Sequence, residues 1–422
     1  MPTKIPQSPS TTLARNTLGR WVTETEPNID IAALQAYRLA RIREQLKIHD
    51  HAACVLYDPI NIRYATGTRN NAVFNMHFLG RHCFVPAEGP VVLFDNPNKI
   101  HLPRGPHVAD EVRPARNWRY MVAGPQVDKN VKLWADEIAD LVTAHGGGNR
   151  RLAIDHCEPQ AAAALLQHGI ELYDGQIELE FARAIKSADE LVCIGVAISA
   201  ADVGMARMHE ALKPGMTENE LWAILHHANI SMGGEWIETR LLSSGGRTNP
   251  WHQECSDRVI QAGELVAFDT DMVGPFGYCA DISRTFHCGP GKPTAQQREL
   301  YNFAYEQIEY NTSLLRAGLT LHELAEQAWT TPEQFVENSY PFIAHGVGMC
   351  DEWPNCFTLD RLEQRGESGV LEAGMTICVE SYIGAAGGDE GVKLEQQVLI
   401  TESSVELLST FPYEENLLGR EL

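Results

Sequence analysis

The feature that most constrains this chain is a set of acidic and histidine side chains in the strand-like segments of its second half. Three carboxylates fall within thirteen residues, and a histidine and two glutamates follow at long intervals. The set consists of Asp269, Asp271, Asp281, His345, Glu380 and Glu395. Burying these donors without a counter-charge is costly, and a pair of metal ions supplies that charge. We therefore expect a fold built around a two-metal site.

The length of 422 residues predicts more than one domain. Residues 1–28 form a polar segment, which we interpret as an N-terminal arm. Residues 29–186 alternate strand and helix patterns, which predicts a smaller α/β domain. Residues 187–422 combine helices with antiparallel-type strands, so an α+β catalytic domain is expected there.

Local signals place several elements of the second domain. Capping-box sequences at Thr217, Thr294 and Thr320 each predict the start of a helix. Apolar segments at 265–271 and 278–286 predict two strands, and the glycine-rich link between them suits a hairpin.

Charge and composition restrict the partners and the location of the protein. A net charge of −22 argues against binding to nucleic acid or to an anionic membrane surface. We find no apolar run near twenty residues and no apolar core of a secretory signal, so neither a transmembrane helix nor export is expected. The ten cysteines form no C-x-x-C pair, which favours free thiols in a reducing cytoplasm.

The order of the acidic and histidine residues resembles the creatinase, prolidase and aminopeptidase P superfamily. Supporting segments are residues 213–218, 277–286 and 345–348, and residues 59–67 extend the likeness weakly to the first domain. The resemblance implies a "pita-bread" catalytic domain preceded by a smaller creatinase-like domain. The ligand order is specific for the fold and says less about the reaction.

Three departures from the peptidases of this superfamily point to one branch of it. Asp271 replaces a glycine, Met349 replaces a second histidine, and Asp351 lies six residues after His345. These features resemble the branch that cleaves dimethylsulfoniopropionate (DMSP) to dimethyl sulfide and acrylate. The resemblance implies that all six residues of the set are metal ligands, that Asp351 is the catalytic base, that the metal is iron and that the protein is a homodimer.

The residue chemistry agrees with this reading and leaves alternatives open. Five carboxylates and one imidazole form a hard, oxygen-rich site that favours iron or manganese over a structural zinc, although zinc remains an alternative. Asp351 would be a general base whose pKa is raised by burial and nearby carboxylates, or it caps a helix or pairs with an arginine.

Aromatic faces bind a sulfonium cation, so we predict substrate contacts near the site. The candidates are Trp251, Tyr340 and Trp353, each of which could instead be a packing residue. His252 resembles an active-site histidine of the peptidases, so it either contacts the substrate or is merely inherited. Lys393 is expected to orient Glu395.

Two other functions remain in competition with the lyase. One is an Xaa-Pro dipeptidase or related hydrolase of the same fold, in which a metal-bridging hydroxide is the nucleophile. The other is a non-catalytic binding module, but members of that kind tend to lose ligands, and here the full set is present.

Overall fold

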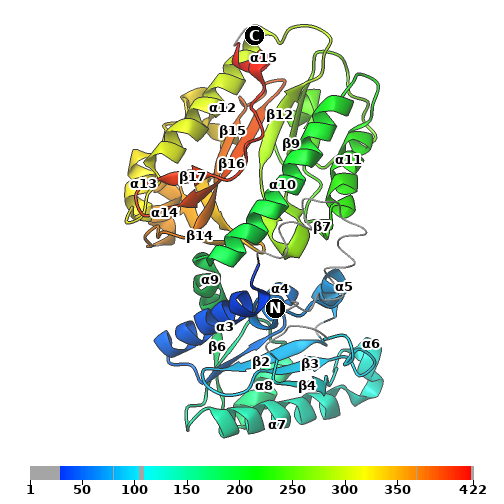
Figure 1. Ribbon diagram of the computed structural model, residues 1–422, viewed down its shortest axis with the longest axis vertical. Coiled ribbons are helices and arrows are strands. Elements are labelled where there is room, and N and C mark those ends of the chain that lie inside the picture. Colours follow the sequence, from blue (N-terminus) through cyan, green and yellow to red (C-terminus); the bar gives the residue numbers. More distant parts are fainter. Residues whose placement is uncertain (1–28, 79, 104–108, 367, 420–422) are drawn as a thin grey trace, which may run out of the picture. The chain divides into compact units, whose positions relative to one another are not determined.

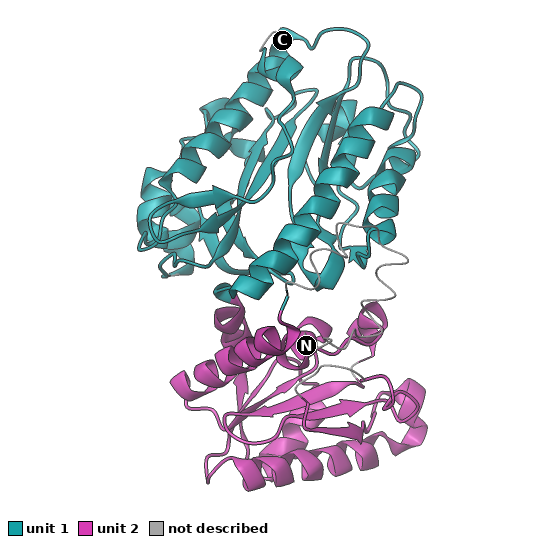
Figure 2. Ribbon diagram, in the orientation of Figure 1, with its two compact units in different colours: residues 1–29, 184–422 teal, residues 30–183 magenta. Residues whose placement is uncertain are grey.

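The computed structural model describes residues 29–78, 80–103, 109–366 and 368–419, and this chain divides into two compact units (Figures 1 and 2). The smaller unit runs from Asp30 to Arg183, and the larger contains the described residues from Ala184 onward. The expected polar arm, residues 1–28, lies outside the described residues.

The smaller unit contains a mixed six-stranded sheet in the order β4-β3-β2-β1-β5-β6. Its strands are β1 (Ala53–Leu56), β2 (His82–Pro86), β3 (Val92–Asp95), β4 (Glu111–Pro114), β5 (Arg151–Ile154) and β6 (Glu171–Asp174). Its helices are α3 (Ile31–Ile48), α4 (Pro59–Thr66), α5 (Ala72–His77), α6 (Tyr120–Ala123), α7 (Val127–His145), α8 (Pro159–Gln167) and α9 (Gln176–Ala184). Apolar residues recur every three or four positions along α7, and this face packs into the core of the unit. The predicted α/β class is confirmed.

A buried histidine makes the stability of this unit sensitive to pH. His82 stacks between the rings of Tyr57 and Phe94, at centroid distances of 5.0 and 4.3 Å. Burial lowers its pKa to about 3, whereas an unfolded histidine titrates near about 6.5. Unfolding therefore takes up a proton between these values, so stability is complete above about pH 6.5 and falls as the pH drops.

We expect His82→Phe to remove this acid sensitivity, because phenylalanine can occupy the same stack without titrating. When the pH falls from 7 to 4.5, the free energy of unfolding should decrease by about 2–3 kcal/mol less in the variant than in the wild type. Calorimetric unfolding at the two pH values measures the difference. Equal losses in the two proteins would contradict the prediction.

The larger unit contains two main sheets that adjoin through β12 and β16, with orders β12-β9-β8 and β14-β13-β15-β16-β17, and a small sheet β11-β10-β7. Its strands are β7 (Trp236–Ile237), β8 (Leu242–Ser244), β9 (Leu265–Asp269), β10 (Met272–Val273), β11 (Cys279–Ala280), β12 (Ser283–His287), β13 (Phe342–Val347), β14 (Asp351–Phe357), β15 (Thr376–Ile383), β16 (Val392–Ile400) and β17 (Val405–Leu407). Its helices are α10 (Ala188–Ala211), α11 (Glu218–Ser231), α12 (Ala295–Leu314), α13 (Leu321–Gln327), α14 (Leu359–Arg365) and α15 (Glu415–Leu418). In Figure 1, α10 and α11 flank the half that contains β9 and β12, and α12 and α13 flank the half that contains β15 and β16. The predicted α+β class is confirmed.

The local signals account for several of these elements. The capping boxes at Thr217, Thr294 and Thr320 all form and begin α11, α12 and α13. The expected hairpin also forms, with β9 paired antiparallel to β12. The short antiparallel pair of β10 and β11 interrupts it at the turn.

Helix α10 is the most apolar of the described helices that reach membrane-spanning length. It is long and apolar enough to cross a membrane by length and composition alone. In this fold 56% of its most apolar window is buried within the protein. Packing against α11 and the small sheet is thus one reason for its apolar composition.

Candidate metal centre

Strand pairing brings the six predicted ligands together from distant parts of the chain. Asp269 ends β9, Asp281 precedes β12, and His345, Glu380 and Glu395 lie on β13, β15 and β16. Glu380 is directly opposite Glu395 in the β15–β16 pair. Because opposite residues in an antiparallel pair project from the same face, the two carboxylates point in the same direction.

The ring of His345 lies at the centre of this group. Its Nε2 atom is 3.6 Å from Asp281 Oδ2, 3.4 Å from Glu380 Oε1 and 3.6 Å from Glu395 Oε1. Asp269, Asp271 and Asp281 each offer a carboxylate oxygen, and these atoms lie within 4.8 Å of one another. The cluster could therefore hold two neighbouring cations, with Asp281 belonging to both groups of donors.

The hydrogen bonding of the cluster fits bound metal ions. Asp269 Oδ1, Asp281 Oδ1 and Glu395 Oε1 are buried without a hydrogen-bond partner among the described residues. Burial and the neighbouring Glu395 carboxylate raise the pKa values of Asp269 and Asp281 well above their usual range. Buried carboxylate oxygens left without donors are unfavourable, and divalent cations satisfy such oxygens directly.

Lys393 provides the positive charge that the protein itself contributes. Its ammonium group is fully buried and lies 3.1 Å from both Asp269 Oδ2 and Glu395 Oε2. It also donates to Glu380 Oε2 and, at 2.6 Å, to Ser283 Oγ. Lys393 thus binds one oxygen of each of three carboxylates, and for Asp269 and Glu395 the other oxygen remains for a metal. From the sequence we had predicted only that Lys393 orients Glu395.

Asp271 occupies a strained backbone position. Its φ is +35°, in the region that favours glycine. Peptidases of the superfamily that the sequence resembles carry a glycine at this position. Its carboxylate accepts a hydrogen bond from Thr239 Oγ1, and burial raises its pKa to about 7. Asp271 thus combines a buried carboxylate with a backbone conformation that a glycine would adopt without strain.

We expect Asp271→Gly to change stability and metal binding in opposite directions. Without metal, the variant should be more stable by about 1 kcal/mol, because the backbone strain is relieved. Its metal affinity should fall, because one predicted ligand is lost. Thermal unfolding of the metal-free protein and metal analysis measure the two effects, with Asp271→Asn as the control of similar size. A less stable metal-free Asp271→Gly would contradict the strain argument.

Asp351 lies beside this group, but its side chain is exposed, whereas we expected it to be buried. It begins β14, its Oδ1 is 3.9 Å from His345 Nδ1, and its side chain is 65% exposed. Met349, in contrast, is buried and leaves no ionisable group at the place where the peptidases carry a histidine. The side chain of Asp351 is therefore exposed to solvent, and the position where the peptidases carry a second histidine is apolar.

The predicted aromatic contacts separate into two places. Trp251 stacks on Tyr382, while His252 stacks on Tyr340 at a centroid distance of 5.5 Å, so these residues form one aromatic cluster. Trp353 instead packs against the hydrophobic core on the α12 side of the larger sheet, and is not brought to this cluster.

Sequence reasoning also missed aromatic residues that belong to the cluster. Phe342 lies 5.0 Å from Tyr340 and 6.0 Å from His345, measured between ring centroids. Tyr382 follows Glu380 by two positions on β15. The two-residue period of a strand could have identified Tyr382, whose side chain is expected on the face of Glu380.

Comparisons with known proteins define the class to which this fold and site belong. Residues 192–402 match Metallopeptidase family M24, and residues 38–185 match the Creatinase/Prolidase N-terminal domain. The chain belongs to metallopeptidase family M24, which confirms the predicted superfamily. The Xaa-Pro dipeptidase from Bacillus anthracis has the same fold, with a TM-score of 0.72 and 22% identity over 89% of this chain and 98% of that one.

Within the family, two relatives are much more similar in sequence. The dimethylsulfoniopropionate lyase DddP of Roseovarius nubinhibens is 39% identical over 95% of this chain and 91% of its own length. The dimethylsulfoniopropionate lyase DddP of Roseobacter denitrificans is 38% identical over 93% and 89%, respectively. The chain therefore belongs to the family of these two relatives over nearly its whole length.

Proposed function

We propose that this protein is a metal-dependent DMSP lyase that produces dimethyl sulfide and acrylate. The observation that carries the proposal is the 39% identity, over 95% of the chain, to a relative named for this activity. Asp271, Met349 and Asp351 support it, because these residues set the chain apart from the peptidases it resembles.

In the proposed reaction, Asp351 removes a proton from the carbon next to the substrate carboxylate. The electrons of this C–H bond form the new carbon–carbon double bond. The C–S bond breaks with its electron pair on sulfur, which leaves as neutral dimethyl sulfide, and the proton stays on Asp351. Metal ions held by the six ligands would supply Lewis acidity that offsets the second negative charge developing beside the carboxylate.

Several finer assignments belong to the proposal. The six predicted ligands hold two metal ions, with iron favoured by the hard oxygen-rich set and manganese or zinc as alternatives. His252, Tyr340 and Trp251 contact the substrate. The protein works as a cytoplasmic homodimer, with an arm at residues 1–28, a creatinase-like domain at 29–186 and the catalytic domain at 187–422.

The second candidate function is an Xaa-Pro dipeptidase. The fold shared with the Bacillus anthracis enzyme favours it. Met349 speaks against it, because a thioether cannot donate a proton to a tetrahedral intermediate. The full set of ligands disfavours the third candidate, a non-catalytic binding module.

One pair of assays separates the candidates. Purified protein, loaded with iron and in parallel with manganese or zinc, is given DMSP, and dimethyl sulfide is measured in the headspace. The same samples receive a panel of Xaa-Pro dipeptides, and released proline is measured. Dimethyl sulfide without proline supports the lyase. Proline without dimethyl sulfide would replace it with the hydrolase, and neither product would favour the binding module.

A further inference from the structure

A buried ion pair lies directly behind the proposed base. The Nζ atom of Lys186 donates a hydrogen bond to Oε1 of Glu352, and the two side chains are 2% and 0% exposed. Glu352 follows Asp351 in β14. Because consecutive side chains of a strand project to opposite faces, Asp351 faces solvent while Glu352 points into the protein.

The ammonium group of this pair is carried by a well-anchored segment. The backbone N–H of Lys186 donates to the carbonyl oxygen of Gly374 at 2.9 Å, two residues before β15 begins. The next residue, Ser187, is the N-cap of α10 and forms a complete capping box. Lys186 is therefore tied to a helix on one side and, on the other, to the strand that carries Glu380.

The segment that contains the base has less regular support. The first two residues of β14, Asp351 and Glu352, pair with Val347 and Gly346 of β13, and the register shifts immediately beyond them. Such a shift interrupts the ladder, so the rest of β14 does not continue this pairing. The carboxylate of Asp351 is 3.9 Å from His345 Nδ1, which is too long for a hydrogen bond. The placement of Asp351 thus depends on its backbone and on its neighbour Glu352.

The Glu352 carboxylate also packs closely against the link between β13 and β14. A Cβ atom at Gly348 would lie 2.5 Å from Glu352 Oε1, closer than non-bonded atoms approach, so a glycine is needed beside the carboxylate. The carbonyl oxygen of Gly348 accepts a hydrogen bond from the backbone N–H of Cys279 at 2.7 Å. Cys279 lies two residues before Asp281, so the same contact region reaches the ligand-bearing part of the chain.

Stability alone does not account for an ion pair at this place. Replacing a buried ion pair by well-packed apolar side chains is often neutral or stabilising, so the charges add little net folding energy. What they add is direction, because the ammonium and the carboxylate fix the point at which two segments meet. A general base needs such precision, since a displacement of about 1 Å can lower a rate by about 100-fold.

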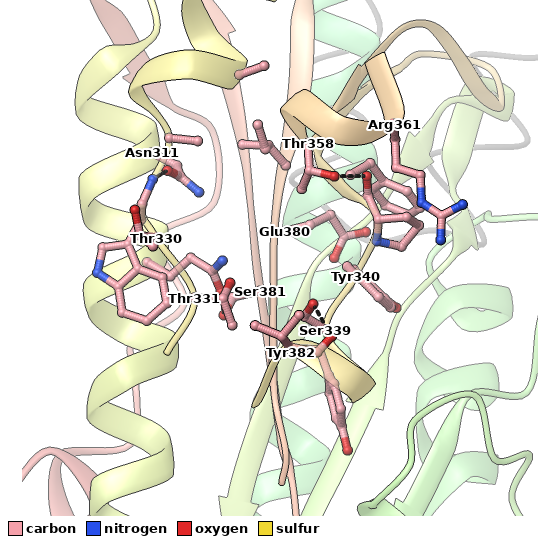
Figure 3. A pocket seen from close by; sticks show the side chains of 18 of the residues that line it. Asn311, Thr330, Thr331, Ser339, Tyr340, Thr358, Arg361, Glu380, Ser381 and Tyr382 are labelled. Carbon is pink, nitrogen blue, oxygen red and sulfur yellow. Dashed lines mark hydrogen bonds between the residues drawn. The ribbon is translucent and has the colours of Figure 1, made fainter. Parts of the chain in front are cut away.

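We propose that Lys186 and Glu352 are positioning residues that hold Asp351 in the orientation needed to remove the substrate proton. The inference rests on the proposed function, in which Asp351 is the base. Neither residue belongs to the predicted ligand set. Neither lines the pocket of about 440 Å³ in Figure 3, whose lining includes Glu380. Loss of the ion pair should therefore leave the metal content and this pocket unchanged.

The test replaces both partners by neutral side chains of similar shape, so that neither charge of the pair remains. Turnover of DMSP by metal-loaded Lys186→Met/Glu352→Gln is measured with Asp351 present and again in the Asp351→Asn background. With Asp351 present, we expect kcat to fall by about 10- to 100-fold. In the Asp351→Asn background the further loss should be less than about 2-fold, because no base remains to be misplaced.

A merely structural role gives a different pattern. It would lower the amount of active protein and so reduce turnover by the same factor in both backgrounds, which would overturn the proposal. Unchanged turnover with Asp351 present would overturn it as well. If the double variant does not fold, Glu352→Gln alone retains an oxygen that accepts from Lys186, and its smaller loss should likewise disappear in the Asp351→Asn background.

A second ion pair of the larger unit provides the matched control. Arg258 and Glu264 form an ion pair, and Glu264 precedes β9 at the end opposite Asp269. Arg258→Met/Glu264→Gln removes the two charges in the same way. This variant should retain the wild-type kcat per metal-loaded protein, in contrast to the variant at Lys186 and Glu352.

Hydrogen exchange gives a readout that does not depend on turnover. In the metal-loaded double variant at Lys186 and Glu352, amides of residues 348–352 should exchange faster than in the wild type, and the control should leave them unchanged. Faster exchange in a protein whose wild type releases no dimethyl sulfide would retain the anchoring and lose the proposed reaction. Release of dimethyl sulfide with exchange and turnover unaffected by the double substitution would retain the reaction and overturn the positioning role.

Discussion

Asp351→Asn is expected to lower the turnover of DMSP by about 10²- to 10⁴-fold, the usual contribution of a general base. An amide of nearly the same shape cannot accept the proton that the proposed elimination removes. The variant should fold normally, because Asp351 begins a strand and its side chain is 65% exposed. Its metal content should match that of the wild type, because Asp351 is outside the predicted ligand set.

Two controls make the result specific. Asp257 is another exposed aspartate of the larger unit, and its Oδ1 accepts a hydrogen bond from Asn219 that an asparagine oxygen can also accept. Asp257→Asn should therefore leave turnover unchanged. If Asp351→Asn retains full turnover, Asp351 is not the base. If it loses metal together with activity, Asp351 is instead a ligand, which its distance of 3.9 Å from His345 Nδ1 would allow.

The ligand cluster was predictable because it depends on residue type and order along strands. Asp269, Asp281 and Glu395 each lie in an apolar, strand-like segment where an acid without a counter-charge is costly, and this signal is visible in one sequence. The pairing of β15 with β16 then places Glu380 opposite Glu395. The order of the residues therefore predicted the convergence, and the register of the sheet produces it.

The surroundings of the cluster depend on tertiary contacts, which the sequence does not display. Trp353 lies two positions after Asp351, so the strand period predicts that both face the site. The β13–β14 pairing shifts register between His345 and Gly346, and Trp353 falls in the irregular segment. Such irregularities re-aim side chains, and Trp353 packs in the core instead.

Burial and long-range ion pairs could not be predicted from the sequence, because they too depend on tertiary contacts. The exposure of Asp351 depends on what covers the start of β14, and no local pattern reports this. The three carboxylate contacts of Lys393 arise because β16 lies between β15 and β12, which is a property of the assembled sheets.

Removal of the metal ions is expected to abolish turnover and to destabilise the larger unit. Ions present at about a thousandfold excess over their dissociation constant would stabilise the native state by about 4 kcal/mol. For a unit of this size, that energy corresponds to a fall in the unfolding midpoint on the order of 10 °C when the ions are removed. The physical cause is the group of buried carboxylates, which includes the unpartnered Asp269 Oδ1 and Asp281 Oδ1. The protein's own ion pairs to these two residues are those with Lys393 and His345.

Calorimetry with and without a chelator, followed by return of the metal, measures this effect. Asp281 belongs to both groups of donors, so Asp281→Asn should make the midpoint nearly insensitive to the chelator while preserving the shape of the side chain. A wild-type midpoint that ignores complete removal of metal would mean that the protein's own cations already balance the cluster. In that case the six side chains would form a buried ion network, and the elimination would have to proceed without the charge compensation on which the proposed role of Asp351 depends.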